Sequence, residues 1–265
     1  LTFTDDLDDR LTFKDFHIYI GTDASGEEIT QLGTVQPASG TKPAVVNWTT
    51  NNADLLAKIK GQKLYWTMDV QYDLSSEDNS QIDNKYQLST TDKNGANENL
   101  ESNKVTVYPP TTITKNNVEP GAGGIINSQG DLIWNGDIKI NNNVYYKDPK
   151  DQQEYVGQVQ FKDYLDPRIK DVTFKVYTSK DKTTEITSYG QLTGQEGVTD
   201  NPQQSPSPAN VLVWTVDAAH VKDVAGKTLY WELNAKYDYQ KAGDNVDKVD
   251  NVAQIITTPI KTPVN

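Results

Sequence analysis

The chain contains two copies of one sequence module, and this repeat constrains the fold more than any other feature. Residues 1–20, LTFTDDLDDRLTFKDFHIYI, match residues 159–178, VQFKDYLDPRIKDVTFKVYT. Further along the chain, the two copies match again in segments around two pairs of tryptophans. They then share an Asp-Asn pair, and the order of the matches is the same in both copies. A conserved order of matches indicates tandem domains. We expect one module over residues 1–110, with its N-terminal strands missing, and a second over 111–265, for which it stays open whether the final strand is included.

Short runs of alternating apolar and polar residues predict β-strands in both modules. In residues 63–73, KLYWTMDVQYD, the apolar side chains fall on every second position, and residues 228–238 repeat the pattern. Alternation with large aromatic residues on one face is typical of antiparallel sheets that pack on a core. Residues 51–61 and 217–226 each predict one short helix that ends at a glycine. The predicted fold is all-β, with two tandem antiparallel β-sandwiches and one short helix per module.

Composition excludes several classes of function. The net charge of -12 argues against a nucleic-acid partner, whose phosphates would be repelled. The chain has no cysteine, so disulfides, thiol catalysis and cysteine-bound zinc are excluded. No apolar run reaches the roughly 20 residues that a membrane span needs, so we expect no span in this fragment.

Polar residues on otherwise apolar strand faces are the main anomaly. Asp5 shares a face with Phe3 and Leu7, and its repeat partner Asp163 lies in the same pattern. Asn103 shares a face with two valines in ESNKVTV, and Lys115 shares one with an isoleucine in TTITKNNV. A carboxylate or an ammonium group is costly to bury unless it is paired or neutralised.

A lysine, an aspartate and an asparagine that face one dry core can form a spontaneous isopeptide bond. Desolvation raises the pKa of the carboxyl group and lowers that of the amine. The neutral amine is then a nucleophile, and the protonated acid polarises the asparagine carboxamide and transfers protons as ammonia leaves. The product is a cross-link that needs no cysteine.

Other assignments remain open from the residues alone. Asn84 and Asn251 also lie on apolar faces and align with each other, which we interpret as a structural role in satisfying backbone groups. Lys139 and Lys147 follow Lys115 in the next predicted strands, and either could face inward instead.

Several motifs in this order resemble a known family. FTDDLDDRL and FKDYLDPRI are similar to a strand of isopeptide-forming, immunoglobulin-like stalk domains in Gram-positive cell-wall adhesins. DNKYQLSTTDKNGANENLESNKVTVYPP is similar to their final hairpin, and ITKNNV to the opening strand that supplies the lysine. The resemblance is to the C-terminal domains of antigen I/II-type adhesins and to aggregation substance. It implies immunoglobulin-like sandwiches.

The resemblance also implies roles for the anomalous residues. Asp5 and Asp163 match the catalytic acid, Asn103 the acceptor amide and Lys115 the amine. The lysine of the first module is then expected before Leu1.

The acceptor asparagine of the second module is expected after Asn265 in the same way. Asn251 is a weaker alternative acceptor, provided that NVAQIITTP is the last strand. Its alignment with Asn84 argues against that assignment.

We therefore expect an extracellular, cell-wall-anchored stalk that presents an adhesive head for attachment or aggregation. Its partners would be other domains of the same adhesin and, through a head outside this chain, a host or bacterial surface ligand. No enzymatic activity is expected beyond autocatalytic cross-linking. The alternative is a module that binds a host protein or glycan through its loops.

No cofactor is expected, although two polar loops leave calcium open. Oxygen-rich loops suit this ion, but neither loop has the spacing of an EF-hand. The weak calcium candidates are Asp73, Asp78, Asp92 and Asn94.

Overall fold

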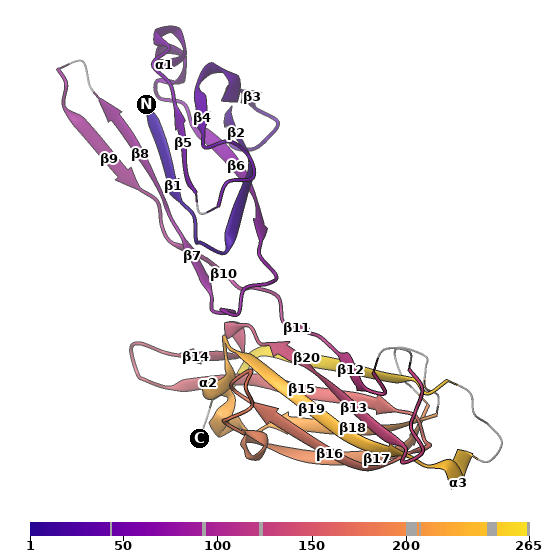
Figure 1. Ribbon diagram of the computed structural model, residues 1–265. Helices are drawn as coiled ribbons and strands as arrows, with labels where there is room; N and C mark the ends of the chain where they lie inside the picture. Colours follow the sequence, from indigo (N-terminus) through magenta and orange to yellow (C-terminus); the bar gives the residue numbers. More distant parts are fainter. Residues whose placement is uncertain are drawn as a thin grey trace. The chain divides into compact units, whose positions relative to one another are not determined.

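The structure is a computed structural model, and most of the chain consists of antiparallel strands. It confirms the predicted all-β class, and Figure 1 shows the strands and the few short helices. The chain divides into two compact units, Leu1–Ser76 with Ile82–Val107 (unit one) and Glu77–Gln81 with Tyr108–Asn265 (unit two). The residues described are 1–42, 44–91, 94–121, 124–199, 206, 208–242 and 248–263.

Unit one is built from two main sheets. One has the strand order β4-β5-β1-β8-β9 and the other β3-β2-β6, and β10 pairs with β7 as a separate ribbon. The elements are β1 (Thr2–Asp6), β2 (Leu11–Ile20), β3 (Glu27–Glu28), η1 (Thr30–Leu32), β4 (Thr34–Gln36), β5 (Val45–Thr49), α1 (Ala53–Ile59), β6 (Leu64–Tyr72), β7 (Ile82–Asn84), β8 (Tyr86–Thr91), β9 (Asn97–Glu101) and β10 (Val105–Val107).

Unit two repeats this plan with additional strands. Its first sheet has the order β11-β13-β19-β16, with β12 also on β13, and its second has β14-β15-β18-β17, with β20 also on β15. The elements are β11 (Thr112–Ile113), β12 (Asn116–Glu119), β13 (Asp131–Lys139), η2 (Asn142–Val144), β14 (Tyr145–Lys147), β15 (Glu154–Leu165), β16 (Ile169–Tyr177), η3 (Thr187–Tyr189), β17 (Gly190–Val198), β18 (Ala209–Val216), η4 (Ala218–His220), α2 (Val221–Val224), β19 (Thr228–Tyr237), α3 (Tyr239–Ala242) and β20 (Asn251–Pro263).

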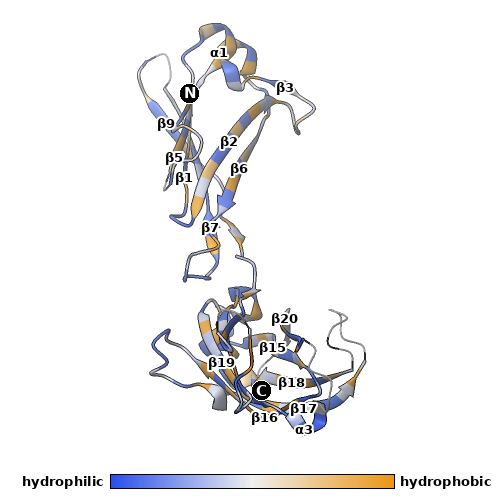
Figure 2. Cartoon of the chain, turned by 45° about the vertical axis from the view of Figure 1, so that its right-hand side comes forward, coloured by the Kyte–Doolittle hydropathy of each residue, from blue (hydrophilic) through white to orange (hydrophobic). Residues whose placement is uncertain are grey.

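The core of each unit is an aromatic cluster between its two sheets. In unit one, Phe3 of β1 packs on Phe16 of β2 at 5.0 Å between ring centroids. In unit two the matching pair, Phe161 of β15 and Phe174 of β16, is 4.6 Å apart. Figure 2 shows the alternation of hydrophobic and hydrophilic residues along the strands. This alternation places one face of each strand against the core.

The repeat extends to polar contacts. The indole Nε1 of Trp48 donates to the Thr30 carbonyl oxygen at 2.9 Å, and that of Trp214 donates to the Thr187 carbonyl oxygen at 3.0 Å. Each indole thereby ties a central strand to the short 3-10 turn that precedes it. The sequence repeat is therefore also a structural repeat.

The predicted helices form, with differences in detail. In α1, the Asn52 side chain caps the helix by accepting from the Leu55 backbone N–H at 3.0 Å. The second predicted helix is split into the 3-10 turn η4 and the single-turn helix α2, and Asp217 makes no side-chain cap. Unit two also has α3, which the sequence did not predict. Among the described residues, no helix is both long and apolar enough to cross a membrane.

Candidate cross-linking site

Asp163 occupies the centre of unit two. It lies on β15 between β18 and β20, opposite Leu212 on one side and Ala253 on the other. Its parity places it on the same face as Phe161, so its carboxylate points into the core, and none of its surface is exposed. The inward orientation predicted from the sequence is what the structure shows.

Lys115 reaches the same point from the opposite sheet. It lies between β11 and β12, where the edge strand that pairs with β13 is interrupted. Its Nζ lies 5.3 Å from the ring centroid of Trp134 and 5.6 Å from that of Trp231. The two indoles place apolar surface next to the ammonium group, and the side chain is only 17% exposed.

A glycine allows the lysine-bearing strand to come this close. A Cβ atom added at Gly136 of β13 would lie 1.9 Å from the Thr114 carbonyl oxygen. That oxygen accepts a hydrogen bond from Trp231 Nε1 at 3.2 Å. Because Gly136 has no side chain, the backbone at Thr114, next to Lys115, can lie in contact with the core residue Trp231.

The lysine and the aspartate are in direct contact. Lys115 Nζ lies 2.9 Å from Asp163 Oδ1 and 3.0 Å from Oδ2. Burial raises the pKa of Asp163 to about 6, although the Lys115 amine and the Asn251 amide act to lower it. Burial likewise lowers the pKa of Lys115, against the opposing pull of Asp163. Both shifts favour the neutral forms of the pair, a free amine and a protonated acid.

Asn251 completes the group from the last strand. It begins β20 opposite Leu165 and is two residues from the partner of Asp163, so it is a diagonal neighbour on the same face. Its amide acts on Asp163 as a hydrogen-bonding group and lowers the pKa of that acid. Among the described residues, however, neither its nitrogen nor its oxygen has a partner at ordinary hydrogen-bond geometry. A buried carboxamide with this shortage of partners is unusual for a purely structural residue.

Unit one contains two of the three groups. Asp5 of β1 is completely buried, and its Oδ2 accepts a hydrogen bond from Asn84 Nδ2 at 3.0 Å. Burial raises its pKa to about 6; the Asn84 hydrogen bond lowers it, and the charge on Asp6 raises it further. Its second oxygen, Oδ1, has no hydrogen-bond partner among the described residues. Asp5 and Asn84 correspond by strand register to Asp163 and Asn251.

The structure does not place Asn103 in contact with Asp5, and its assignment as the acceptor stays a prediction. Asn103 is exposed between β9 and β10, where its Nδ2 is 3.5 Å from the Lys104 carbonyl oxygen. The strand beside β1 is β8, which is preceded by Asn84, whereas β9 lies on the far side of β8. The amide next to the acid is therefore Asn84.

The structure also places the other candidates of unit two. Asn251 lies beside the acid, on β20, and the expectation of an acceptor after Asn265 stays a prediction. Of the alternative lysines, Lys139 ends β13 and Lys147 is exposed on β14; Lys115 is the one that contacts Asp163. The alignment of Asn84 with Asn251 is the sequence signal that could have indicated these amides, although we interpreted it as a structural role.

The calcium candidates are engaged in local contacts or lie outside the described residues. Asp73 pairs with Lys42 at 2.5 Å and accepts from the Ser75 backbone N–H at 2.9 Å. Asp78 accepts from the Ser80 backbone N–H, Asn94 lies in a turn, and Asp92 is outside the described residues. Within the described parts of the chain, no three acidic or histidine side chains gather as a metal site. The expectation of no cofactor, with calcium left open, stays a prediction.

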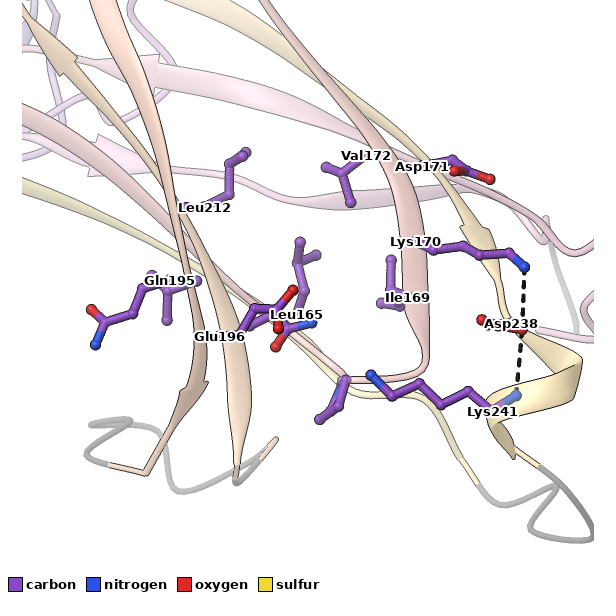
Figure 3. A pocket seen from close by; sticks show the side chains of 14 residues that line it. Leu165, Ile169, Lys170, Asp171, Val172, Gln195, Glu196, Leu212, Asp238 and Lys241 are labelled. Carbon is purple, nitrogen blue, oxygen red and sulfur yellow. Dashed lines mark hydrogen bonds and ion pairs between the residues drawn. The ribbon is translucent and has the colours of Figure 1, made fainter.

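A separate pocket of about 520 Å³ opens at one end of unit two (Figure 3). Leu165 and Ile169 contribute apolar surface, and Lys170 faces Asp238 across its rim at 3.2 Å. Because this lysine is already paired with a carboxylate, the rim offers a charged ligand little net attraction.

Comparisons with solved structures find similarities at low sequence identity. The C-terminal domain of the AgI/II polypeptide BspA from Streptococcus agalactiae is 15% identical, with 99% of this chain and 81% of that chain covered and a TM-score of 0.37. The C-terminal domain of the antigen I/II-family protein AspA from Streptococcus pyogenes is 14% identical, covering 99% and 82%, with a TM-score of 0.35. The major pilin subunit BcpA of Bacillus cereus is 18% identical, covering 83% and 56%, with a TM-score of 0.37. No family model and no curated protein sequence matches the chain.

Proposed function

We propose that unit two cross-links itself through an amide between Lys115 Nζ and Asn251 Cγ, and that the chain is an extracellular stalk segment of a Gram-positive surface adhesin. The observation that carries the proposal is the contact of Lys115 Nζ with both oxygens of the fully buried Asp163, beside the Asn251 carboxamide. Cell-wall attachment and a separate adhesive head belong to the same proposal and follow from the family resemblance of the sequence.

The reaction balances without a cofactor. The neutral Lys115 amine attacks Asn251 Cγ, and the Nζ–Cγ bond forms as the Cγ–Nδ2 bond breaks. Protonated Asp163 donates a proton toward the amide and receives the proton that Lys115 gives up, so the departing nitrogen leaves as ammonia. Asp163 ends in its starting state and acts as a general acid and base.

The core supports this chemistry in three ways. Burial lowers the pKa of the amine and raises that of the acid, as a nucleophile and its proton donor require. The tryptophans on either side of Lys115 restrict the positions of its Nζ. Because the groups belong to one folded unit, they are held together at a high effective concentration.

The position of the bond suits a mechanical role. Lys115 lies at the first strand of unit two, and Asn251 begins its last strand. A covalent link between them would carry a pulling force past the residues in between, even if the sheets opened. The stability of such a module would be kinetic as well as thermodynamic.

Intact mass spectrometry of the full chain tests the proposal. The chain should be one ammonia lighter than its sequence mass, and Lys115→Ala, Asp163→Ala and Asn251→Ala should each restore the full mass. Lys147→Ala, which removes an exposed lysine of the same unit, should keep the loss. A wild-type chain with the full sequence mass would refute the cross-link.

A further inference from the structure

A single arginine connects the segment before the acceptor asparagine to two other parts of unit two. Arg168 lies in the turn between β15, which carries Asp163, and β16. Its Nη2 donates to the Lys248 carbonyl oxygen at 2.9 Å, three residues before Asn251. Its Nη1 donates to the hydroxyl of Tyr237, the last residue of β19, at 3.3 Å. One side chain thereby joins the segment before β20 to the end of a strand in the opposite sheet.

The turn fixes the direction of this arginine. The Asp166 carbonyl oxygen accepts from the Ile169 backbone N–H at 2.9 Å, and Pro167 stands at the second position, as tight turns favour. The Asp166 carboxylate accepts from Arg168 Nε at 2.9 Å and from Nη2 at 2.7 Å. Arg168 Cζ lies 5.5 Å from the ring centroid of Tyr237, and the arginine side chain is 13% exposed. Because the donors of a guanidinium group have fixed directions, this pairing also determines where Nη2 points.

The position of the Asn251 carboxamide depends on how its backbone is held. Among the described residues, its own nitrogen and oxygen have no partner at ordinary hydrogen-bond geometry. On one side, the pairing of β20 with β15 starts at Asn251 and Leu165. On the other side, Val249 packs against the core and the Lys248 carbonyl accepts from Arg168. Arg168 lies as far beyond Leu165 as Lys248 lies before Asn251, so their hydrogen bond joins the two chains just past the end of the ladder.

We propose that Arg168 is a positioning residue for the cross-link: it holds the backbone before β20, so that Asn251 Cγ stays within reach of Lys115 Nζ. Arg168 acts through this backbone and not on the reacting atoms, and its role rests on the cross-link proposed for unit two. A small displacement of a reacting group slows a reaction strongly, so loss of this anchor should slow the cross-link about tenfold or more.

The arginine acts by geometry and not by its charge. Asp166 opposes that charge directly, at 2.7 Å from Nη2. The pKa of Asp163 is raised by burial and lowered by Lys115 and Asn251. Replacement of Arg168 should therefore lower the rate of cross-linking at every pH and leave the shape of its pH dependence unchanged.

Unit one contains the same turn, which supplies a matched control. Arg10 Nε and Nη2 each donate to the Asp8 carboxylate at 2.7 Å, and the Leu11 backbone N–H donates to the Asp8 carbonyl oxygen at 2.9 Å. Arg10→Ala removes the equivalent guanidinium group from the other unit. It should leave cross-linking in unit two at the wild-type rate.

The test follows the loss of ammonia in full chains made by cell-free synthesis, with intact mass spectrometry at intervals and at several pH values. Arg168→Ala should lose ammonia about tenfold or more slowly than the wild type. Arg168→Lys keeps the charge but cannot donate to Asp166 and Lys248 in the same directions, so it should also be slow. Circular dichroism shows that each variant is folded, and the lysine variant decides the matter if the alanine variant is not.

Free guanidinium distinguishes positioning from a general effect on stability. At millimolar concentrations, far below those that denature proteins, the ion can occupy the space between Asp166 and Lys248 in Arg168→Ala. It should restore part of the rate. An arginine that only stabilised the fold would give the opposite result, because guanidinium weakens folding.

Two sets of results have different meanings. A wild-type chain that never loses ammonia would refute the cross-link itself, and with it the role of Arg168. If the wild type reacts and the folded Arg168 variants react equally fast, or if guanidinium fails to restore the rate of Arg168→Ala, the cross-link stands and Arg168 does not position Asn251.

Discussion

Lys115 and Asp163 are 48 residues apart in the chain and belong to opposite sheets, yet the amine lies within 3.0 Å of both carboxylate oxygens. An ordinary buried ion pair needs further hydrogen bonds to offset the loss of hydration. The other groups shown beside the amine include two indole rings, which accept no ordinary hydrogen bond. We therefore expect the pair to be a weak source of stability as a salt bridge, as the proposed reaction between neutral groups requires.

Removal of the acceptor amide should destabilise unit two. Asn251→Ala leaves Lys115 and Asp163 in place but prevents the bond, so the unfolded chain regains the freedom of the long loop between residues 115 and 251. The loop-entropy argument used for disulfides gives about 5 kcal/mol for a loop of this size. Calorimetry should show a lower Tm for unit two. Asn84→Ala, the matched change in unit one, should leave that transition unchanged, and an unaltered transition in Asn251→Ala would contradict the expectation.

Asp5 should make the stability of unit one depend on pH. Its pKa is raised from 3.8 to about 6 by burial, so the folded state holds this proton more tightly than the unfolded chain. The free energy of unfolding should therefore fall as the pH rises from about 4 to about 6, by up to about 3 kcal/mol. Urea titrations at several pH values would measure this slope.

Asp5→Asn should remove that component of the slope. Asp6→Asn, an equal change of charge at the exposed neighbouring position, is the matched control and should retain most of it, because the Asp6 charge is the smallest of the causes that shift the pKa of Asp5. Identical slopes in the wild type and in Asp5→Asn would show that Asp5 is not the responsible group.

Gly136→Ala should impair cross-linking without touching any of the three reacting residues. The added Cβ would lie 1.9 Å from the Thr114 carbonyl oxygen, so the strand that carries Lys115 must move away from Trp231. Mass spectrometry should find a larger fraction of chains that keep their ammonia. Gly194→Ala, whose Cβ would meet Val211 at an ordinary 3.8 Å, is the control and should cross-link fully.

Calcium should have little effect on unit one at the Asp73 loop. The Lys42 ammonium already pairs with Asp73, and the Ser75 hydroxyl and backbone N–H occupy its other oxygen. We expect the same Tm in excess calcium and in a chelator. A rise of several degrees with calcium would show that the loop rearranges to bind the ion.

The sequence predicted the strands and the inward acids because both depend on local alternation. Alternation along the strand places Asp5 and Asp163 on the faces that pack on the core, and the same pattern occurs in both copies of the repeat. Lys115 was predicted in the same way, because it lies two residues after an isoleucine and so on the same face of the strand.

The alternation of side chains along a strand could not identify the amide beside Asp5. That identity depends on which strand pairs with β1. Asn103 and Asn84 both lie near apolar residues, but β8 pairs with β1 while β9 is one strand further away. This pairing is long-range, and no local pattern encodes it.

The position of the ammonia loss distinguishes the Lys115–Asn251 amide from other reactions of the chain. A succinimide at the Asn94-Gly95 step would also release one ammonia, so the chain should be digested with trypsin and the peptides identified by tandem mass spectrometry. The cross-link predicts one branched species in which the peptides containing Lys115 and Asn251 are joined, with no cleavage after Lys115. Separate, unmodified peptides, with cleavage after Lys115, would contradict it.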